Sequence, residues 1–443
     1  MFSRSVVEQI SKSKKEPAWM LNLRLKAYDA FVSKPMPSWQ VPDISVLDFD
    51  DMSLYNPVPI KATDWADVPK GIRRVYEDAG IIRAECNLLG GSVAQYMSES
   101  VYERIRQDFE KQGVIFCSMD EAVRRYPSLV RKHFTKVVPI DDNKFSALHY
   151  ALWSGGTFLY VPDGVNVSLP MHAYFYMKEK GEGQFEHTLI IAGEGSKVHY
   201  IEGCTALAQS KYSLHSAVVE VIAGNNSHVR YTTVQNWSKN IYNLNTKRAV
   251  VYDGAVMEWV GGSLGAKVSM LYPSSILVGR GACATHLAIT VAQKGTVKES
   301  GAKVIHMAPS TKSKVSSRSI CIDDGHSVYR GLVDIGSGAR GAVSNVDCNS
   351  LLIGARSMAD TFPYSRISEH EDVHFAHEAT TTRISQQYID YAMCRGISKE
   401  EAILMYVNGF IEPILREIPL EYAIELNNYI RQYVESSEEA YVG

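Results

Sequence analysis

Three stretches of the chain differ in how apolar and polar residues alternate. In residues 1–137 apolar side chains recur at spacings of three and four, most clearly over 20–31, which predicts helices. The same spacing predicts helices over 70–80 and 99–112. No catalytic or metal-binding pattern stands out in this region, so we expect it to act in packing or docking.

Residues 138–378 alternate instead with a period of two. Short runs rich in Val, Ile, Tyr and Thr are separated by turn signals, from Gly155-Gly156 to Gly336-Ser337-Gly338. No long amphipathic helix interrupts them, so we expect an all-β body that is a sandwich, a barrel or a β-helix. No repeat of fixed length is visible, and periodicity alone does not choose among the three.

Residues 379–443 return to helical spacing. A first helix carries Tyr388 and Tyr391 on one face, and Ser398 with Glu401 predicts a capping box at the start of a second helix. A third helix is expected nearer the C-terminus. Apolar stripes of this kind predict packing against a core.

Composition and charge exclude several classes of protein. The chain of 443 residues is 45% apolar and 21% charged, with a net charge of −3, as in an ordinary globular protein. No long basic block suggests a nucleic-acid partner, and no apolar run approaches the ~20 residues of a membrane span. The N-terminus lacks the apolar stretch of a signal peptide. We therefore expect a cytoplasmic protein without nucleic-acid or membrane partners.

The cysteines are scattered and never form C-x-x-C. They are Cys86, Cys117, Cys204, Cys283, Cys321, Cys348 and Cys394. This spacing encodes neither a disulfide framework nor a closed local zinc or cluster site. Any metal site must therefore be assembled from distant segments or from two chains.

The densest group of potential metal ligands lies downstream of Cys348. It contains three imidazoles and three carboxylates: His370, Glu371, Asp372, His374, His377 and Glu378. Thiolate suits iron bound to sulfide, whereas imidazole and carboxylate are harder ligands that exchange more readily. Mixed donors of this kind favour a metal that must later leave.

Two further motifs in the chain are judged by their local pattern. His370, Glu371 and His374 spell the H-E-x-x-H of zinc hydrolases, which requires a helix to place both histidines on one face. The alternation from Val373 onward favours an extended segment instead. Residues 336–341 fit G-x-G-x-x-G, but no helix pattern follows, so we expect a turn there. The chain has no P-loop motif and is not expected to hydrolyse ATP by itself.

Several stretches, in order along the chain, resemble the SufB branch of the SufB/SufD family of iron–sulfur cluster assembly proteins. Besides S-L-L-I-G, D-T-F-P-Y and H-E-A-T-T-x-R-I after Cys348, they include Glu16-Pro17-Ala18-Trp19-Met20, Glu202-Gly203-Cys204-Thr205, Thr233-Val234-Gln235-Asn236-Trp237 and Arg395-Gly396-Ile397-Ser398. The resemblance implies a mainly β protein with a right-handed parallel β-helix core over 138–378, flanked by helical regions over 1–137 and 379–443. It also implies a scaffold protein, not an enzyme.

The resemblance assigns roles to particular residues. Cys204, in E-G-C-T-A, corresponds to the family's sulfur acceptor, a role that calls for an exposed thiol with a lowered pKa. Sulfur would then pass Gln235, Trp237 and Lys247, which correspond to residues lining a tunnel inside the β-helix. Independently, a glutamine on an inward strand face must find a polar partner, which indicates a lined cavity; an outward face with an exposed glutamine is the alternative.

The cluster site implied by the resemblance consists of Cys348, Glu378 and His377, where a nascent, transient iron–sulfur cluster would be built. On a strand His377 and Glu378 point to opposite faces, so only one of them can share a side with Cys348 unless the chain turns. Tyr176 and His187 stand where the family usually has arginines. One positive charge expected in the tunnel is therefore absent or supplied elsewhere.

The same resemblance implies partners. They are an ABC-type ATPase, SufC, docking on residues 379–443; a second β-helix subunit, either SufD or another copy; and a cysteine desulfurase with its sulfur-transfer protein. A reduced flavin is associated with some family members, and no motif here tests it. The alternatives are a SufD-like partner subunit, a zinc hydrolase using His370, Glu371 and His374, a β-helix carbohydrate-active enzyme, and a purely structural adaptor.

Overall fold

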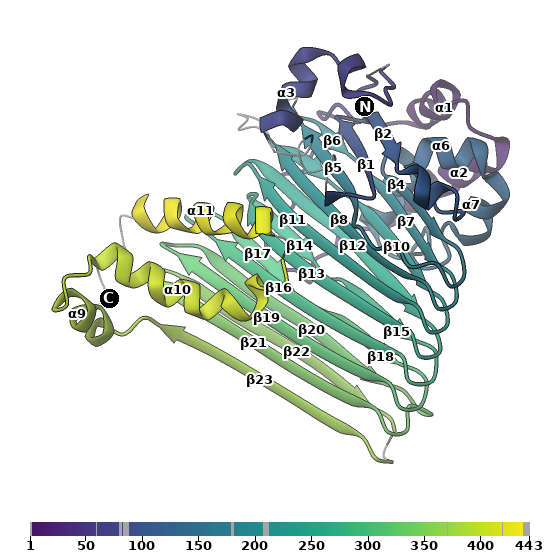
Figure 1. Cartoon of the computed structure of the whole chain (residues 1–443). Helices are drawn as coiled ribbons and strands as arrows, with labels where there is room; N and C mark the ends of the chain where they lie inside the picture. The colour runs from purple at the N-terminus through teal and green to yellow at the C-terminus, as the bar shows by residue number, and fades with distance from the viewer. Residues whose placement is uncertain are drawn as a thin grey trace.

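Two long sheets of mainly parallel strands form the body of the molecule (Figure 1). They wind into a β-solenoid of about eight turns, which confirms the expected β-helix. The structure is a computed structural model that describes residues 2–58, 60–78, 82, 88–178, 181–206, 212–369, 371–418 and 420–436.

Each sheet takes one strand, or one pair of short strands, from most turns of the solenoid. The first sheet has the order β2 (Glu99–Ile105), β1 (Gly91–Tyr96), β5 (Met171–Met177), β8 (Lys197–Ala206), β11 (His228–Trp237), β13 (Val256–Gly265), β16 (Cys283–Ala292), β19 (Lys312–Ile322), β21 (Val343–Ile353) and β23 (His374–Arg383). The second has the order β14 (Val268–Leu271), β17 (Val297–Ser300), β20 (His326–Ile335), β18 (Lys303–His306), β15 (Ser274–Leu277), β12 (Ile241–Val251), β10 (Val218–Ala223), β7 (His187–Ala192), β4 (Thr157–Val161) and β3 (Ile115–Ser118). β22 (Met358–Ile367) pairs with β20, and β9 (Ser213–His215) pairs with both β6 (Gly183–Gln184) and β12.

The stacking of turns explains why no repeat is visible in the sequence. One column of paired residues in the first sheet consists of Tyr200, Tyr231, Trp259, His286, Val315, Val346 and His377. Their separations along the chain are 31, 28, 27, 29, 31 and 31 residues. Both the length of a turn and the side chain at a given position change from one turn to the next, so self-similarity is lost although the geometry repeats.

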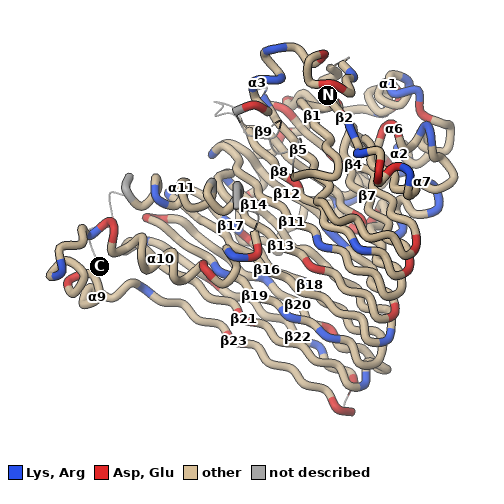
Figure 2. Tube along the Cα trace, in the orientation of Figure 1, with Lys and Arg blue, Asp and Glu red and all other residues tan. Residues whose placement is uncertain are grey.

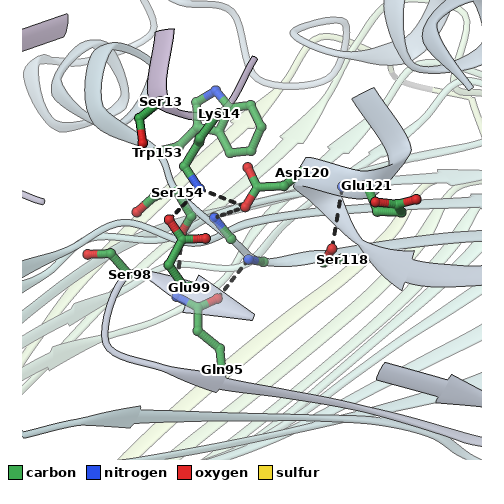
Figure 3. A network of polar contacts seen from close by, with 12 residues as sticks. Ser13, Lys14, Gln95, Ser98, Glu99, Ser118, Asp120, Glu121, Trp153 and Ser154 are labelled. Atoms are coloured by element: carbon green, nitrogen blue, oxygen red, sulfur yellow. Dashed lines mark hydrogen bonds and ion pairs between the residues drawn. The ribbon is translucent and has the colours of Figure 1, made fainter. Parts of the chain in front are cut away.

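Short helices cover the first turns of the solenoid. They are α1 (Arg4–Ser13), α2 (Ala18–Ser33), the 3₁₀ helix η1 (Trp65–Asp67), α3 (Lys70–Asp78), α5 (Gln107–Glu110), α6 (Met119–Arg125), α7 (Pro127–His133) and α8 (Lys144–Leu152). Lys14, just after α1, is buried and donates hydrogen bonds to Asp120 of α6 (2.7 Å) and Glu99 of β2 (3.2 Å), as Figure 3 shows. This buried ion-paired network ties the N-terminal helices to the first strands.

Two details of the expected layout were wrong. Residues 99–105 form strand β2, not a helix, because Val101 and Tyr102 are buried against β1 and neighbouring aromatic rings; only α5 is helical there. Pairing with β1 overrides the local helical spacing. Helix α8 also lies inside the predicted all-β body. The boundaries at 137/138 and 378/379 remain a prediction.

Two helices, α10 (Lys399–Leu415) and α11 (Leu420–Ser436), lie across the outer face of the first sheet, and α9 (Gln386–Met393) packs against α10 beyond the end of β23 (Figure 1). Their apolar residues, Val407 and Ile411 among them, share a core with outward residues of the sheet such as Ile289. The capping box of Ser398 is confirmed. Tyr388 and Tyr391 do not pack as expected and are largely exposed.

The distribution of charged and apolar residues over the folded chain does not point to a nucleic-acid or membrane-spanning function. Lys, Arg, Asp and Glu are interspersed along the turns at the edge of the solenoid (Figure 2). None of the helices in the described part of the chain combines the length and apolar character that a membrane crossing requires. Residues 336–341 form the predicted turn between β20 and β21.

Candidate functional site

The interior of the solenoid contains a cavity whose walls are mostly apolar, with a few polar side chains among the lining residues. Alternate residues of β11, from Tyr231 through Gln235 to Trp237, point inward and are buried, which confirms the predicted inward face. The cavity has a volume of about 70 Å³. Its lining begins at Gln235 and Lys247 and extends along the solenoid axis to Ser317 of β19 and Tyr329 of β20.

A buried ion pair lies at the first end of this cavity. The ammonium of Lys247 is 3.2 Å from Glu202 Oε1 and 3.1 Å from the hydroxyl of Tyr231. The Tyr231 hydroxyl in turn donates to Glu202 Oε2 at 2.6 Å, and the ammonium lies 4.6 Å from the centre of the tyrosine ring. The Glu202 carboxylate is therefore well compensated despite its burial.

Cys204 lies beside this pair. Its thiol is 2% exposed and 3.8 Å from Glu202 Oε1, and it pairs in register with Gln235 on the neighbouring strand. Burial, followed by the charges of Glu202 and Glu186, raises the pKa of Cys204 well above that of a free cysteine. Neither condition that we set for an acceptor thiol, exposure or a lowered pKa, is met in this conformation.

Gln235 and Trp237 each have a side-chain N–H group without a hydrogen-bond acceptor among the described residues. Gln235 Oε1 accepts a hydrogen bond from Asn243 Nδ2 at 2.6 Å, whereas Gln235 Nε2 has no partner among the described residues. The Trp237 indole stacks on His215 with 4.5 Å between ring centres, and its N–H is also without a partner there. Unpaired buried donors are costly, so they mark a place where a ligand or water is expected.

At the last turn of the solenoid, two predicted metal ligands meet. Cys348 of β21 and His377 of β23 both point inward, and the thiol sulfur lies 3.3 Å from His377 Nε2. The thiol also contacts the main-chain carbonyl of Glu378 at 3.4 Å. Burial, then the charge of Asp347, raises the pKa of Cys348 to about 11, and burial lowers the pKa of His377.

The carboxylate of Glu378 does not join them. Glu378 pairs in register with Asp347, which points away from the interior and binds Arg318 at 2.8 Å. Its side chain is exposed. The expectation that only one of His377 and Glu378 can share a side with Cys348 is confirmed, and the residue that does is His377.

Tyr329 connects the cavity with the Cys348 site. Its ring lines the far end of the cavity and lies 6.1 Å from the imidazole of His377, centre to centre. Burial, with a smaller contribution from Cys348, raises its pKa. The cavity therefore starts next to Cys204 and ends next to Cys348.

The two departures from the family pattern face away from this interior. Tyr176 stacks on Tyr96 on the outer side of the first sheet, at 5.5 Å between ring centres. His187 is buried against the N-terminal helices, with His149 at 3.1 Å and Glu220 at 3.3 Å. Side chains at these two positions do not reach the cavity, and the positive charge beside it is that of Lys247.

The structure does not fit the zinc hydrolase alternative. His374 begins strand β23, and Asp372 adopts a left-handed backbone conformation, so no helix carries His374 as H-E-x-x-H requires. His370 lies outside the described residues. Among those that are described, no group of three or more His, Cys, Asp or Glu side chains could hold a metal ion.

Sequence reasoning missed three interior residues: Glu186, His215 and Asn243. They are fully buried: Asn243 Nδ2 donates to Gln235 Oε1, His215 Nδ1 lies 2.8 Å from Asn243 Oδ1, and Glu186 Oε2 lies 2.7 Å from His215 Nε2. His215 lies on a strand of three residues, too short for alternation to show which way its side chain points. A histidine just before the apolar run Ala217-Val218-Val219 was the one available signal.

Comparisons with known proteins cover nearly the whole chain. Residues 175–410 match the family model described as "SUF system FeS cluster assembly, SufBD core domain", and residues 7–172 match the "SufBD protein N-terminal region". Iron-sulfur cluster assembly SufBD family proteins of Staphylococcus saprophyticus and Staphylococcus epidermidis are 47% identical over 436 residues, covering 98% of this chain and 93% of each relative. A Staphylococcus aureus relative is 46% identical over the same coverage.

Proposed function

This chain belongs to the SufBD family of iron–sulfur cluster assembly proteins, and we propose that it is a SufB-type scaffold that receives sulfur inside its solenoid and builds a nascent cluster at its last turn. The observation that carries this proposal is the meeting of Cys348 and His377 at 3.3 Å, at the far end of an interior cavity. Thiolate and imidazole together can hold iron bound to sulfide and still release it.

The cluster in this proposal is cargo, not a resident cofactor. One thiolate and one imidazole do not complete the ligand set of a cluster, so further ligands come from sulfide and from a second chain. Large apolar residues are exposed along β22, the last strand of the second sheet, at Met358, Phe362, Tyr364 and Ile367. An apolar end of this kind suits pairing with a second solenoid, either SufD or another copy. Glu378 would then act only from the outer face of β23.

Sulfur delivery is assigned to Cys204 and the cavity beside it. The donor would be a persulfide from a cysteine desulfurase and its sulfur-transfer protein, and Gln235, Trp237 and Lys247 would line the route. Because the Cys204 thiol is buried and its pKa is raised, acceptance requires that the end of β8 open when the donor docks. The E-G-C-T motif around Cys204 favours SufB over SufD.

The energy for opening the scaffold is assigned to a partner. We place the docking surface for the ATPase SufC on the C-terminal helices, where Tyr388, Tyr391 and Met405 are exposed. Exposed aromatic residues are common anchors of protein interfaces. In this scheme the chain is not itself an enzyme and works in the cytoplasm.

Anaerobic reconstitution tests the scaffold assignment. The purified chain, alone and with SufC, is given ferrous iron and sulfide, and bound iron, acid-labile sulfide and visible absorbance are measured. Cys348→Ala should lose the cluster, and His377→Ala should bind it more weakly. Cys321→Ala is the matched control, since it removes a buried thiol from the neighbouring strand β19 without touching the site.

Two results would contradict the proposal. A full cluster yield in Cys348→Ala would exclude the site. A wild-type chain that forms a cluster only with a second SufBD subunit, and that tolerates both Cys204→Ala and Cys348→Ala, would be the SufD-like partner instead.

A further inference from the structure

A groove with a basic floor lies on the outer face of the second sheet, beneath the segment 34–41. Its volume is about 550 Å³. The floor is formed by Arg248 of β12, Ser274 of β15 and Lys303 of β18, which pair in register on neighbouring strands. The segment itself forms one wall, and the start of α8 forms the other. The groove is therefore on the side of this sheet that faces away from the interior cavity.

The segment that forms the wall is fixed at both ends by charged side chains. At its start, the Lys144 ammonium of α8 donates to the main-chain carbonyl of Lys34. Near its other end, the N–H of Val41 donates to Glu299 Oε2 of β17 at 2.9 Å. Glu299 is fully buried, and its other oxygen accepts from Arg330 at 2.6 Å. The wall therefore crosses the strands from α8 to β17 in a fixed position, without help from a ligand.

The charges that line the groove are mostly positive and incompletely paired. Among the described residues of its lining, Asp142 is the only acidic one, and it accepts from Arg248 Nη1 at 2.8 Å. The other guanidinium nitrogens of Arg248 and the ammonium of Lys303 have no hydrogen-bond partner in the described part of the chain. Burial, then the charge of Arg248, lowers the pKa of Lys303. A half-buried ammonium beside a second cation is unfavourable unless an anion joins them.

The spacing of the two cations indicates the shape of that anion. Arg248 and Lys303 are separated by two strand spacings, because each pairs in register with Ser274 on the strand between them. Two such spacings amount to about 9.6 Å. In a polyproline II helix, residues three apart lie on one face and are about 9.3 Å apart along the axis. Two carboxylates at that separation would each meet one cation, whereas a small anion such as phosphate would require the cations to converge on one point.

Aromatic and proline side chains form the rim of the groove. The Trp39 ring lies 5.8 Å from that of Tyr272, centre to centre, and the Arg330 guanidinium lies 5.3 Å from the Trp39 ring. Trp39 nevertheless remains 52% exposed, and Pro35 and Pro37 precede it on the same wall. Aromatic-lined grooves bind proline-rich segments in the polyproline II conformation, since that conformation loses little entropy on binding.

We propose that this groove is a docking site for an acidic, proline-containing segment of a partner protein, which binds as a polyproline II helix with carboxylates three residues apart on Arg248 and Lys303. The exposed ring of Trp39 packs on the prolines between them. The inference does not rest on the scaffold function, because the groove contains none of the residues assigned to sulfur or iron.

Fluorescence anisotropy of a labelled peptide tests the proposal on the full chain. The probe is the peptide Pro-Glu-Pro-Pro-Glu-Pro, and its matched control is Pro-Gln-Pro-Pro-Gln-Pro. The wild type should bind the first peptide saturably, with an affinity that falls as salt is added, and should bind the control at least about tenfold more weakly, as expected for lost charge-assisted hydrogen bonds. Lys303→Met should lose affinity to a similar extent, and Lys303→Arg should retain it. Lys314→Met removes an exposed lysine from the outer face of the first sheet and should bind like the wild type.

Three results would overturn the proposal: no saturable binding of the acidic peptide, equal affinity for the two peptides, or unchanged affinity in Lys303→Met. Binding of pyrophosphate in place of the peptide would also overturn it and would assign the groove to a small anion. If Lys303→Met fails to fold, the comparison of the two peptides on the wild type decides. Peptide binding requires neither iron nor sulfide, so its outcome is independent of cluster reconstitution.

Discussion

Replacing Lys247 by methionine separates an electrostatic role of this residue from a role in sulfur passage. The ammonium of Lys247 is held by Glu202 at 3.2 Å and by the Tyr231 hydroxyl at 3.1 Å, and both charged side chains are almost fully buried. Methionine keeps the length and apolar stem of lysine but leaves the Glu202 carboxylate without its cation. A loss of cluster assembly in this variant would therefore have two explanations, one of which is instability.

The expected size of the instability follows from the contacts. Removing one partner of a buried, hydrogen-bonded ion pair costs about 3–5 kcal/mol, because the remaining charge stays desolvated. Whole domains are stable by only about 5–15 kcal/mol, so the loss is large. In Lys247→Met/Glu202→Gln both charges are gone, and the glutamine still accepts from Tyr231. We expect the double variant to lose no more than about 1–1.5 kcal/mol, so that adding Glu202→Gln to Lys247→Met recovers roughly 2–3.5 kcal/mol of stability.

Urea unfolding followed by tryptophan fluorescence measures all four proteins of this cycle. Lys247→Met should unfold at clearly lower urea, and Glu202→Gln added to it should restore most of the midpoint. A single variant within about 0.5 kcal/mol of the wild type, or a cycle whose two effects simply add, would refute the electrostatic reasoning. Cluster assembly is then compared in the stable double variant, where any remaining defect reports on passage through the cavity.

Three further outcomes can be checked. Asp347 raises the pKa of Cys348 and Arg318 lowers it, so Asp347→Asn should speed alkylation of Cys348 by iodoacetamide at pH 8 and Arg318→Met should slow that reaction. Equal alkylation rates in the two variants and the wild type would contradict this electrostatic account. Burial lowers the pKa of His286 to about 3, so the unfolded chain takes up the proton first and stability falls as the pH drops below about 6.5, by on the order of 3 kcal/mol at pH 4.5. His286→Gln should flatten that part of the stability curve, and an unchanged acid slope would argue against it. Tyr388→Ser/Tyr391→Ser should abolish capture by SufC, whereas Val32→Ser, an equally exposed apolar site on α2, should not; undiminished capture would move the docking surface elsewhere.

The regular elements were predictable where local spacing agrees with tertiary packing. The capping box at Ser398 starts α10 as expected, since its bonds are local. The helix predicted from residue 99 was wrong over 99–105, because pairing with β1, a separate strand, decides the conformation of these residues. The β-helix itself could not be chosen from periodicity, since turns of 27 to 31 residues place different side chains in one column. The family resemblance supplied what the pattern could not.

The same distinction between local pattern and tertiary contact separates the features of the candidate site that could be predicted from those that could not. Strand alternation alone indicated that Gln235 points inward and that His377 and Glu378 point to opposite faces. It could not show that His215 meets Asn243, because that contact joins separate turns of the solenoid and depends on their register. Nor could it show that Cys204 is buried beside Glu202, which follows from the interior packing of β8 against β11.

The interior charges near Cys204 are arranged in pairs that cancel, and this limits what the cavity can carry. Glu186 pairs with His215, and Glu202 pairs with Lys247, so neither an isolated cation nor an isolated carboxylate faces the space beside Gln235. In a medium of low polarity an unpaired cation would bind a passing anion too tightly to release it, and an unpaired carboxylate would repel it. Balanced pairs leave no net charge that would trap or repel an anion on its way. Substitutions that unbalance either pair, in either direction, should therefore slow transfer more than substitutions that remove a whole pair.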